Sequence, residues 1–412
     1  MRRAVITGLG PLTPIGIGKA AFFHGLQSGI SAVRRISRFD ASAFRSQIAA
    51  EISDFDPTHY FEARELKRMD RYSQFAVVAS RLAITDAGLE LSEENRDRVG
   101  VAIGSALGGT AYAEAQLHAF VTKGLRAVET ALAISVFCGA GSCNTAITFG
   151  ITGPASANSN SCASGTIALG EALEWIRHDR ADVVLAGGAE APLAPLCYGA
   201  FALIRAMSCQ NEAPTSACRP FDARRDGFVM GEGAGMLVVE ELRHAQARGA
   251  HIYGEIIGYG LTNDAHHMTA PRPDGIQAAR AIELALADAD IHPQQLDYIN
   301  AHGSSTLLND RTETLAIKQI LGKHAYAIPL SSTKGHHAHP LGAAGAIEGI
   351  ACALALEHAY IPPTVNLEYP DTECDLDYTP NIGRHLPIHT LLSNSFGFGG
   401  INACLILRKI EG

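Results

Sequence analysis

Cys162 lies in the segment SNSCASGTIALGEAL, between small polar residues and a stretch of apolar residues at helical spacing. That spacing predicts a helix beginning next to the thiol. Two interpretations are open. Buried cysteines are commonly small, inert core residues. A cysteine beside the unpaired N–H groups and positive dipole end of a helix can instead have a lowered pKa and act as a thiolate nucleophile.

Two histidines are positioned to complete such a site. The chain has 17 histidines, so placement must select among them. His302 follows the apolar run LDYIN and precedes the small turn GSST. His339 precedes a glycine- and alanine-rich helix start, but two further histidines stand within three residues of it, and spacing alone leaves all three open. Lys334 and Glu348 flank this segment, and a buried charge pair between them could order it.

One thiol and two imidazoles fit thioester chemistry. A thiolate can attack an acyl thioester and carry the acyl group, and neutral imidazole N–H groups can stabilise an enolate oxygen formed later. The turn SNSFGFGG near the C-terminus adds backbone N–H groups that its glycines allow close to a ligand.

An α/β framework is expected to bring these turns together. Apolar strand-like runs alternate with helical periodicity, which indicates α/β layers with buried strands. Ligands bind beyond the carboxyl ends of strands in such sheets, and these turns are expected there.

The chain also repeats its own plan. AVITGLGPLTP near the N-terminus resembles EIIGYGLTND from Glu255, and the segment from Arg81 resembles the segment from Arg280. A duplication explains the shared order and spacing, and chance similarity of common α/β patterns is the alternative. We expect two halves packed as one unit: residues 1–249 with the nucleophile and residues 250–412 with the catalytic histidines.

Composition argues against several classes of protein. The 412 residues are 47% hydrophobic, which suits a large globular chain, and the net charge of −9 argues against a nucleic-acid partner. Nine scattered cysteines without a C-x-x-C pair favour reduced thiols and a cytoplasmic setting over zinc. We expect neither a signal peptide nor a membrane span.

Several long motifs, in order along essentially the whole chain, resemble those of the elongating β-ketoacyl-[acyl-carrier-protein] synthases, which have the thiolase fold. NSCASG is similar to the nucleophile motif of that family. NAHGSSTLLND and STKGHHAHPLGAAGAIE are similar to its two histidine blocks, and RPFDARRDGFVMGEGAG and SNSFGFGGINA also match. The resemblance implies a five-layered αβαβα core built from two duplicated halves.

The resemblance implies catalytic roles for matching residues. Cys162 accepts the acyl group, and His302 and His339 form the catalytic pair, which selects His339 from its neighbours. Lys334 organises the site. Two acidic residues support that lysine: Glu348 and Glu313.

Other residues are implied to surround the substrate. The N–H groups of Cys162 and Phe398 form the oxyanion hole, and the gating loop consists of Phe398, Gly399 and Gly400. The substrate-binding residues are Leu107 at the floor of the acyl pocket, Thr269 and Thr306 along the pantetheine arm, and Phe396. Four residues can surround a monovalent cation: Asn300, Glu348, Ser393 and Asn394.

The implied reaction is the decarboxylative Claisen condensation of a malonyl group on acyl carrier protein with an acyl group on Cys162, which lengthens a fatty-acid, polyketide or polyene chain by two carbons. No cofactor is required beyond the phosphopantetheine of the carrier protein. The implied assembly is a homodimer or a heterodimer with a chain-length-factor-like subunit. The acidic carrier protein is expected to dock on Arg64, Lys67, Arg68 and Arg71, with Lys123, Arg126 and Arg205 near them. A solvated helix face is the alternative interpretation of these charges.

The chain departs from the family pattern in several places. Ala338 stands where the family has glycine, SSTLLND and GGIN are altered motifs, and GLRAVETALAIS from Gly124 replaces a stretch at the dimer interface and acyl tunnel. These departures favour a specialised synthase, and the small residues of 130–143 predict a roomier or differently directed acyl tunnel. The two histidine blocks argue against a thiolase or starter-type synthase, and Cys162 argues against a non-catalytic chain-length partner.

Overall fold

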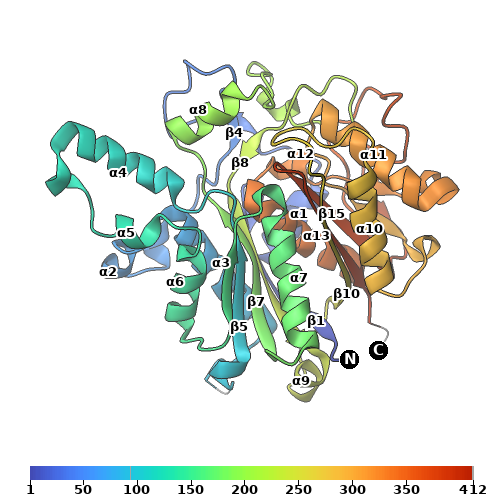
Figure 1. Cartoon of the computed structure of the whole chain (residues 1–412), viewed down its shortest axis with the longest axis horizontal. Coiled ribbons are helices and arrows are strands. Elements are labelled where there is room, and N and C mark those ends of the chain that lie inside the picture. The colour runs from blue at the N-terminus through green and yellow to red at the C-terminus, as the bar shows by residue number, and fades with distance from the viewer. Residues whose placement is uncertain (93, 411–412) are drawn as a thin grey trace.

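A computed structural model describes residues 1–92 and 94–410 (Figure 1). Its main feature is an eleven-stranded sheet in the order β12-β11-β15-β16-β10-β1-β9-β7-β5-β6, with β2 (Gly16–Ile17) paired to β1. The other strands are β1 (Ala4–Thr13), β5 (Val99–Gly104), β6 (Ala155–Asn158), β7 (Val183–Glu190), β9 (Gly233–Glu241), β10 (Gly254–Asn263), β11 (Tyr298–Asn300), β12 (Leu330–Ser331), β15 (Thr390–Gly397) and β16 (Ile401–Arg408).

The strand order is symmetrical about the central antiparallel pair β1–β10. Moving outward on the two sides, β9 and β16 are antiparallel to the central strands, and β7 and β15 are antiparallel to these. Then β5 and β11 are parallel to their neighbours, as are β6 and β12. This symmetry agrees with a duplication, and the boundary between residues 249 and 250 stays a prediction.

Helices and strands form five layers, αβαβα, the arrangement of the thiolase fold. The outer helix α3 (Arg71–Ala87) packs on β1 and β9, and the outer helix α10 (Ile276–Asp288) packs on β10 and β16. Between the two halves of the sheet lie α7 (Ser164–Arg177) and α13 (Ala344–His358), which contact each other and strands of both halves. Figure 1 shows α3 and α10 on opposite flanks of this core.

Glycines explain how closely the outer helices approach. A Cβ on Gly8 or Gly10 of β1 would lie only 2.2 or 1.9 Å from a backbone oxygen of α3. A Cβ on Gly258 or Gly260 of β10 would lie 2.3 or 2.0 Å from a backbone oxygen of α10. The two outer layers therefore use the same device, at positions that belong to the repeated GLG and GYG sequences.

The segment Leu341–His358 is apolar enough by composition to cross a membrane, with a mean hydropathy of 1.2. However, 89% of it is buried inside the protein. It contains α13, and its apolar surface is covered by the sheet and by α7. Its composition is therefore that of a core helix.

The remaining elements surround this core. The other helices are α1 (Lys19–Gln27), α2 (Ala63–Leu66), α4 (Thr110–Lys123), α5 (Leu132–Ser135), α6 (Ala140–Phe149), α8 (Pro195–Leu203), α9 (Leu242–Ala247), α11 (Leu307–Leu321) and α12 (Lys334–His337). Two small sheets contain β3 (Arg34–Arg35), β4 (Ile48–Ala50) and β8 (Met230–Gly231), and β13 (Tyr360–Ile361) and β14 (Arg384–His385). In Figure 1, α4 and α5 project from the body of the molecule.

Candidate active site

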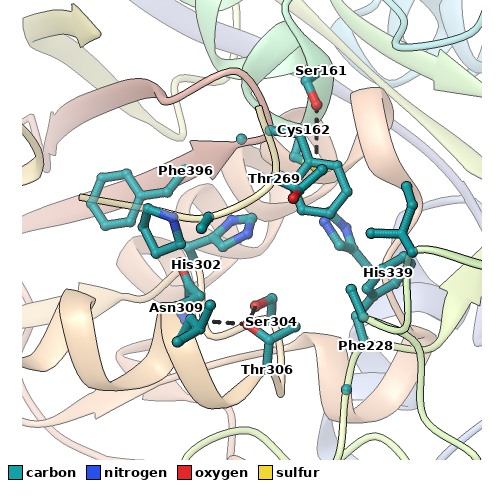
Figure 2. A pocket seen from close by; sticks show the side chains of 18 of the residues that line it. Ser161, Cys162, Phe228, Thr269, His302, Ser304, Thr306, Asn309, His339 and Phe396 are labelled. Atoms are coloured by element: carbon teal, nitrogen blue, oxygen red, sulfur yellow. Dashed lines mark hydrogen bonds between the residues drawn. The ribbon is translucent and has the colours of Figure 1, made fainter. Parts of the chain in front are cut away.

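A cavity of about 300 Å³ brings the predicted reactive groups together. Cys162, His302 and His339 line it, as do Phe396 and Phe398 of the C-terminal loop region. Figure 2 shows both histidines extending toward the region of Cys162. The rings of His302 and His339 lie edge to face, with centroids 5.3 Å apart.

Cys162 lies in a single 3-10 turn, Ser161–Ala163, directly before α7. It is 7% exposed. Burial raises the pKa of the Cys162 thiol, while the Ser161 hydroxyl, the charge of Lys334 and the Phe398 N–H act in the opposite direction. The prediction that the helix terminus lowers the pKa of Cys162 is therefore wrong, because burial has the largest influence on that pKa and raises it.

His302 follows β11 and is held by two buried charged groups. Its backbone N–H donates to Glu313 Oε1 at 2.8 Å, and the N–H of Gly303 donates to Glu313 Oε2 at 2.9 Å. Lys334 Nζ donates to the His302 carbonyl oxygen at 2.5 Å and lies 3.4 Å from His302 Nδ1. Because the ammonium can only donate, His302 is expected to carry its proton on Nε2.

His339 lies between α12 and the 3-10 turn that begins α13. Its backbone bridges to β8: its N–H donates to the Val229 carbonyl at 2.9 Å, and its carbonyl accepts from the Gly231 N–H at 3.0 Å. Ala338 precedes it at φ 59° and ψ −160°, a region that favours glycine. The bridge therefore holds the turn in this conformation although the residue is alanine.

The two neighbouring histidines point elsewhere. His336 Nε2 lies 3.1 Å from the Pro363 carbonyl oxygen, and His337 Nε2 lies 3.0 Å from Thr333 Oγ1. Neither lines the cavity. Of the three histidines in this segment, geometry thus selects His339.

Lys334 and Glu348 form a buried ion pair beneath the histidines, and both side chains are fully buried. Burial raises the pKa of Glu348 to about 7 even though Lys334 acts to lower it. Burial and the Lys334 charge hold the pKa values of His302 and His339 well below their usual range. Both imidazoles are therefore neutral near pH 7, the form that can donate an N–H to a developing oxyanion.

The glycine loop between β15 and β16 covers the thiol. Gly397 packs against the nucleophile turn so closely that a Cβ there would lie 3.1 Å from the Cys162 nitrogen. Gly399 and Gly400 follow Phe398 with φ of 82° and 74°, which glycine adopts readily. The Phe398 ring stacks on Phe201 with centroids 6.4 Å apart.

Three of the four predicted substrate-binding residues line the cavity: Thr269, Thr306 and Phe396. The Thr306 side chain also caps α11, accepting from the Asn309 N–H at 3.2 Å. Leu107 does not line this cavity. It packs against the apolar cluster that contains Cys162, one residue beyond Ala106, which does line it. Its role as the floor of an acyl pocket stays a prediction.

A buried carboxylate that the sequence analysis missed holds the turn with Leu107. Glu190, at the end of β7, accepts from the N–H groups of Ala106 at 2.6 Å, Leu107 at 3.1 Å and Gly342 at 3.0 Å. Burial raises its pKa to about 7. Glu190 therefore links the turn after β5 to the 3-10 turn that follows His339 and begins α13. An acidic residue ending the apolar run VVLAGGAE is the signal that could have found it.

The predicted docking residues do not form one patch. Arg64, Lys67 and Arg68 are exposed on and after α2, where Arg68 O accepts from Ser135 Oγ of α5 at 3.2 Å. Arg205 instead lines the cavity after α8, and Figure 1 shows α2 and α8 well apart.

Arg71 was wrongly included among the docking residues, because it turns inward. It is bound to the buried carboxylate of Glu232 at 3.0 Å and lies over the Phe75 ring. Its charge is therefore used inside the fold.

The four candidate cation ligands are buried together beneath the site. Ser393 Oγ donates to Asn300 Oδ1 at 3.4 Å, and Asn394 Nδ2 donates to Glu313 Oε1 at 3.1 Å. Glu348 Oε2 has no hydrogen-bond partner. Oxygen donors with one open carboxylate oxygen fit a hard cation. Within residues 1–92 and 94–410, no cluster of three or more His, Cys, Asp or Glu side chains could hold a metal.

Comparison with known proteins places this geometry in a family. Residues 1–245 match the sequence model of the beta-ketoacyl synthase N-terminal domain, and residues 253–368 match that of the C-terminal domain. The chain is 47% identical to 3-oxoacyl-[acyl-carrier-protein] synthase 2 of Synechocystis sp., covering 100% of this chain and 99% of that protein. It is 46% identical to putative polyketide beta-ketoacyl synthase 1 of Streptomyces cyaneus, with the same coverage.

Solved structures of ketosynthases are similar to this chain over its whole length. A type II polyketide ketosynthase in complex with its acyl-carrier protein has a TM-score of 0.93 and 40% identity, and the match covers 100% of both chains. The ishigamide ketosynthase/chain length factor has a TM-score of 0.93 and 36% identity, again over 100% of both chains.

Proposed function

The chain belongs to the β-ketoacyl synthase family and is a β-ketoacyl-[acyl-carrier-protein] synthase, and from this premise we propose how its own residues carry out the decarboxylative condensation. The observation that supports the proposal most is the meeting of Cys162, His302 and His339 in one cavity, with both imidazoles neutral and the two rings 5.3 Å apart.

In the first half-reaction, Cys162 is the nucleophile. Its sulfur attacks the carbonyl carbon of an acyl thioester, a new carbon–sulfur bond forms, and the bond to the carrier thiol breaks. The carrier thiol leaves with the proton that Cys162 gives up. We propose that the N–H groups of Phe398 and Cys162 stabilise the tetrahedral oxyanion.

In the second half-reaction, His302 and His339 act on a malonyl thioester. Loss of CO₂ leaves an enolate, and the two neutral imidazoles donate N–H groups to its oxygen. The enolate carbon then attacks the acyl carbonyl, and the bond to Cys162 breaks. The β-ketoacyl product stays on the carrier, two carbons longer than the acyl group, and Cys162 regains a proton.

Lys334, Glu348 and Glu313 are positioning residues in this scheme. Lys334 and Glu313 hold the backbone of His302 from two sides, and Glu348 neutralises Lys334. A monovalent cation held by oxygens of Glu348 and Asn300 would supply further positive charge beneath the site, without a part in bond making.

The substrate donor is proposed to be an acyl carrier protein whose phosphopantetheine reaches Cys162 past Thr269 and Thr306, which line the cavity. We propose no other cofactor. Arg205, which is exposed and lines the cavity, is the basic residue best placed to meet the acidic carrier. A setting in the cytoplasm, where thiols stay reduced, suits the free cysteines.

A dimer is proposed through the face formed by α4, α5, α6 and the edge strand β6. Large apolar side chains are exposed there, including Val121, Leu125, Phe137 and Ile147, the last at 79% exposure. An apolar surface beside an unpaired strand edge is typical of a subunit interface. We propose this face for either partner, a second copy of this chain or a chain-length-factor-like subunit.

We propose that the product is a specialised chain, such as a polyketide or polyene. Fatty-acid and polyketide relatives match about equally, at 47% and 46% identity. The support comes from the altered segments, among them the one from Gly124 that includes α5 at the proposed dimer face.

Intact mass spectrometry of the carrier protein tests the proposal. After incubation with acyl and malonyl carriers, the enzyme should yield a carrier bearing a β-ketoacyl group two carbons longer, and Cys162→Ala should yield none. A product formed without malonyl carrier would indicate a thiolase, and the absence of any product with every partner subunit tested would indicate a non-catalytic chain-length subunit.

A further inference from the structure

We propose that Ser161 is a further catalytic residue, whose hydroxyl donates a hydrogen bond to the sulfur of Cys162. Ser161 Oγ lies 3.7 Å from Cys162 Sγ, within the longer reach of hydrogen bonds to sulfur. Figure 2 shows this contact on the side of Cys162 facing away from Ser304 and Thr306. The inference rests on the proposed role of Cys162 as nucleophile and deepens it.

The backbone of the nucleophile turn places both side chains in the same cavity. Neighbouring side chains of an extended strand point to opposite faces. Ser161 instead has φ 53°, an uncommon conformation for a residue other than glycine, and it and Cys162 both line the cavity. The turn is held by Ser164 Oγ, which donates to the Ser161 carbonyl at 2.7 Å, and by close packing of Gly397.

The carbonyl of Ser161 therefore accepts a hydrogen bond within the turn, whereas its hydroxyl lies within hydrogen-bond distance of the thiol. Among the described residues, the sulfur of Cys162 is the hydrogen-bond partner recorded for Ser161 Oγ. A conformation that costs energy, held by several contacts, is expected where it serves the site. The conformation here aims a donor at the reacting atom.

Cys162 needs such a donor because its surroundings disfavour the thiolate. Burial is the largest influence on its pKa and raises it, and the Ser161 hydroxyl is first among the groups that counteract burial. Lys334 acts through charge alone, and Phe398 belongs to the short glycine loop between β15 and β16. Hydrogen bonds to charged acceptors are stronger than those to neutral ones, so the Ser161 hydroxyl favours the thiolate over the thiol.

The test measures the rate of iodoacetamide alkylation of Cys162 against pH, with the labelled residue identified by peptide mass spectrometry. In Ser161→Ala, the midpoint of the profile should move up by about one pH unit, and the rate near pH 7 should fall about tenfold. At a pH above both midpoints, the rates of variant and parent should converge. A purely structural defect would lower the rate at every pH instead.

Two variants control for the backbone. Ser161→Gly also lacks the hydroxyl but adopts φ 53° readily, so it should show the same shift as Ser161→Ala. Ser159→Ala, whose hydroxyl donates to the Ala106 carbonyl at 3.0 Å and not to the thiol, should keep the parental profile. Superposed profiles for parent and Ser161→Gly would overturn the inference.

The same data separate this inference from the proposed function. If alkylation of Cys162 does not abolish condensation, the role of Cys162 as nucleophile fails. If labelling of Cys162 abolishes condensation while both Ser161 variants keep the parental profile, only the role of Ser161 fails.

Discussion

Lys334 donates to the backbone carbonyl of His302 at 2.5 Å from within the folded core, where its charge is paired with Glu348. Lys334→Met should therefore lower both the stability of the fold and the rate of malonyl decarboxylation. Leaving Glu348 buried and unpaired should cost about 3–5 kcal/mol of unfolding free energy, and releasing His302 should slow malonyl decarboxylation about a hundredfold.

The double variant Lys334→Met/Glu348→Gln separates these effects, because it leaves no buried charge at the pair. Denaturant titration should show that it regains much of the lost stability, while decarboxylation stays slow. Recovery of decarboxylation together with stability would mean that Lys334 only balances charge.

Because several histidines are buried, we expect the free energy of unfolding to fall in mild acid. Burial lowers the pKa of His336 to about 4 and of His337 to about 3, and those of His302 and His339 lie well below 6.5. Below about pH 6.5 the unfolded chain binds protons that the folded chain does not, so stability decreases as pH falls. Five buried acids act in the opposite direction: Glu190 and Glu348, with pKa values raised to about 7, and Glu313, Asp310 and Asp70, whose pKa burial also raises. We expect the histidines to outweigh them.

Denaturant unfolding at pH 5.0 and pH 7.5 measures this balance. We expect a lower free energy of unfolding at pH 5.0 than at pH 7.5. His336→Asn/His337→Asn, which removes two titrating groups outside the cavity, should show a weaker dependence. Greater stability at pH 5.0 than at pH 7.5 contradicts the expectation.

The turn held by Glu190 is expected to influence acyl chain length. Enlarging Leu107 to Phe should shorten the longest acyl chain accepted and leave short chains nearly unaffected, since each excluded methylene forfeits about 0.8 kcal/mol. A panel of acyl carriers of increasing length measures this. The same factor of slowing at every length would make Leu107 a packing residue only.

Glu190→Gln should also change the preference among acyl chain lengths, by shifting the turn that holds Leu107. The amide nitrogen would face a backbone N–H that now donates to a carboxylate, so the turn should shift, with a loss of about 1–3 kcal/mol in denaturant titration. We expect altered preference among acyl lengths beside this loss. Unchanged preference with reduced stability would confine Glu190 to a structural role.

Carrier docking should depend more on Arg205 than on the α2 cations, because Arg205 lines the cavity and α2 lies apart from α8. Arg205→Glu should raise KM for carrier-bound substrate about tenfold and weaken its salt dependence, while small thioesters are unaffected. Lys67→Glu/Arg68→Glu should have a smaller effect, and Lys323→Glu, an exposed reversal elsewhere, should have none. Equal losses with carrier-bound and small substrates would indicate a damaged site.

Motifs predicted most of the residues that meet in the cavity, because each motif carries its own turn: Cys162 precedes its helix, and His302 follows its strand. The choice of His339 over its neighbours needed either family resemblance or the bridge to β8, which joins residues over a hundred positions apart. Arg71 was misassigned because its partner, Glu232, is 161 positions away.

The energetic properties of the site were harder to predict. The pKa direction of Cys162 was missed because burial depends on the packing of Gly397 and the loop after it, which local sequence does not reveal. The alternation of apolar strand-like runs with helical periodicity, by contrast, allowed the α/β plan to be predicted. The structure adds the reason for the repeated glycines, which let the outer helix pack closely on the sheet in both halves.

The central claim is that the imidazoles serve decarboxylation and that the thiol acts without an imidazole base. The decisive measurement compares two rates in His302→Ala and His339→Ala: acyl transfer to Cys162, followed by intact mass, and CO₂ release from malonyl carrier. We predict that CO₂ release falls by about 10²–10⁴ in each variant, while acyl transfer survives in part. Equal and total loss of acyl transfer in both variants, with CO₂ release retained, would contradict the account and indicate a cysteine–histidine nucleophile pair instead.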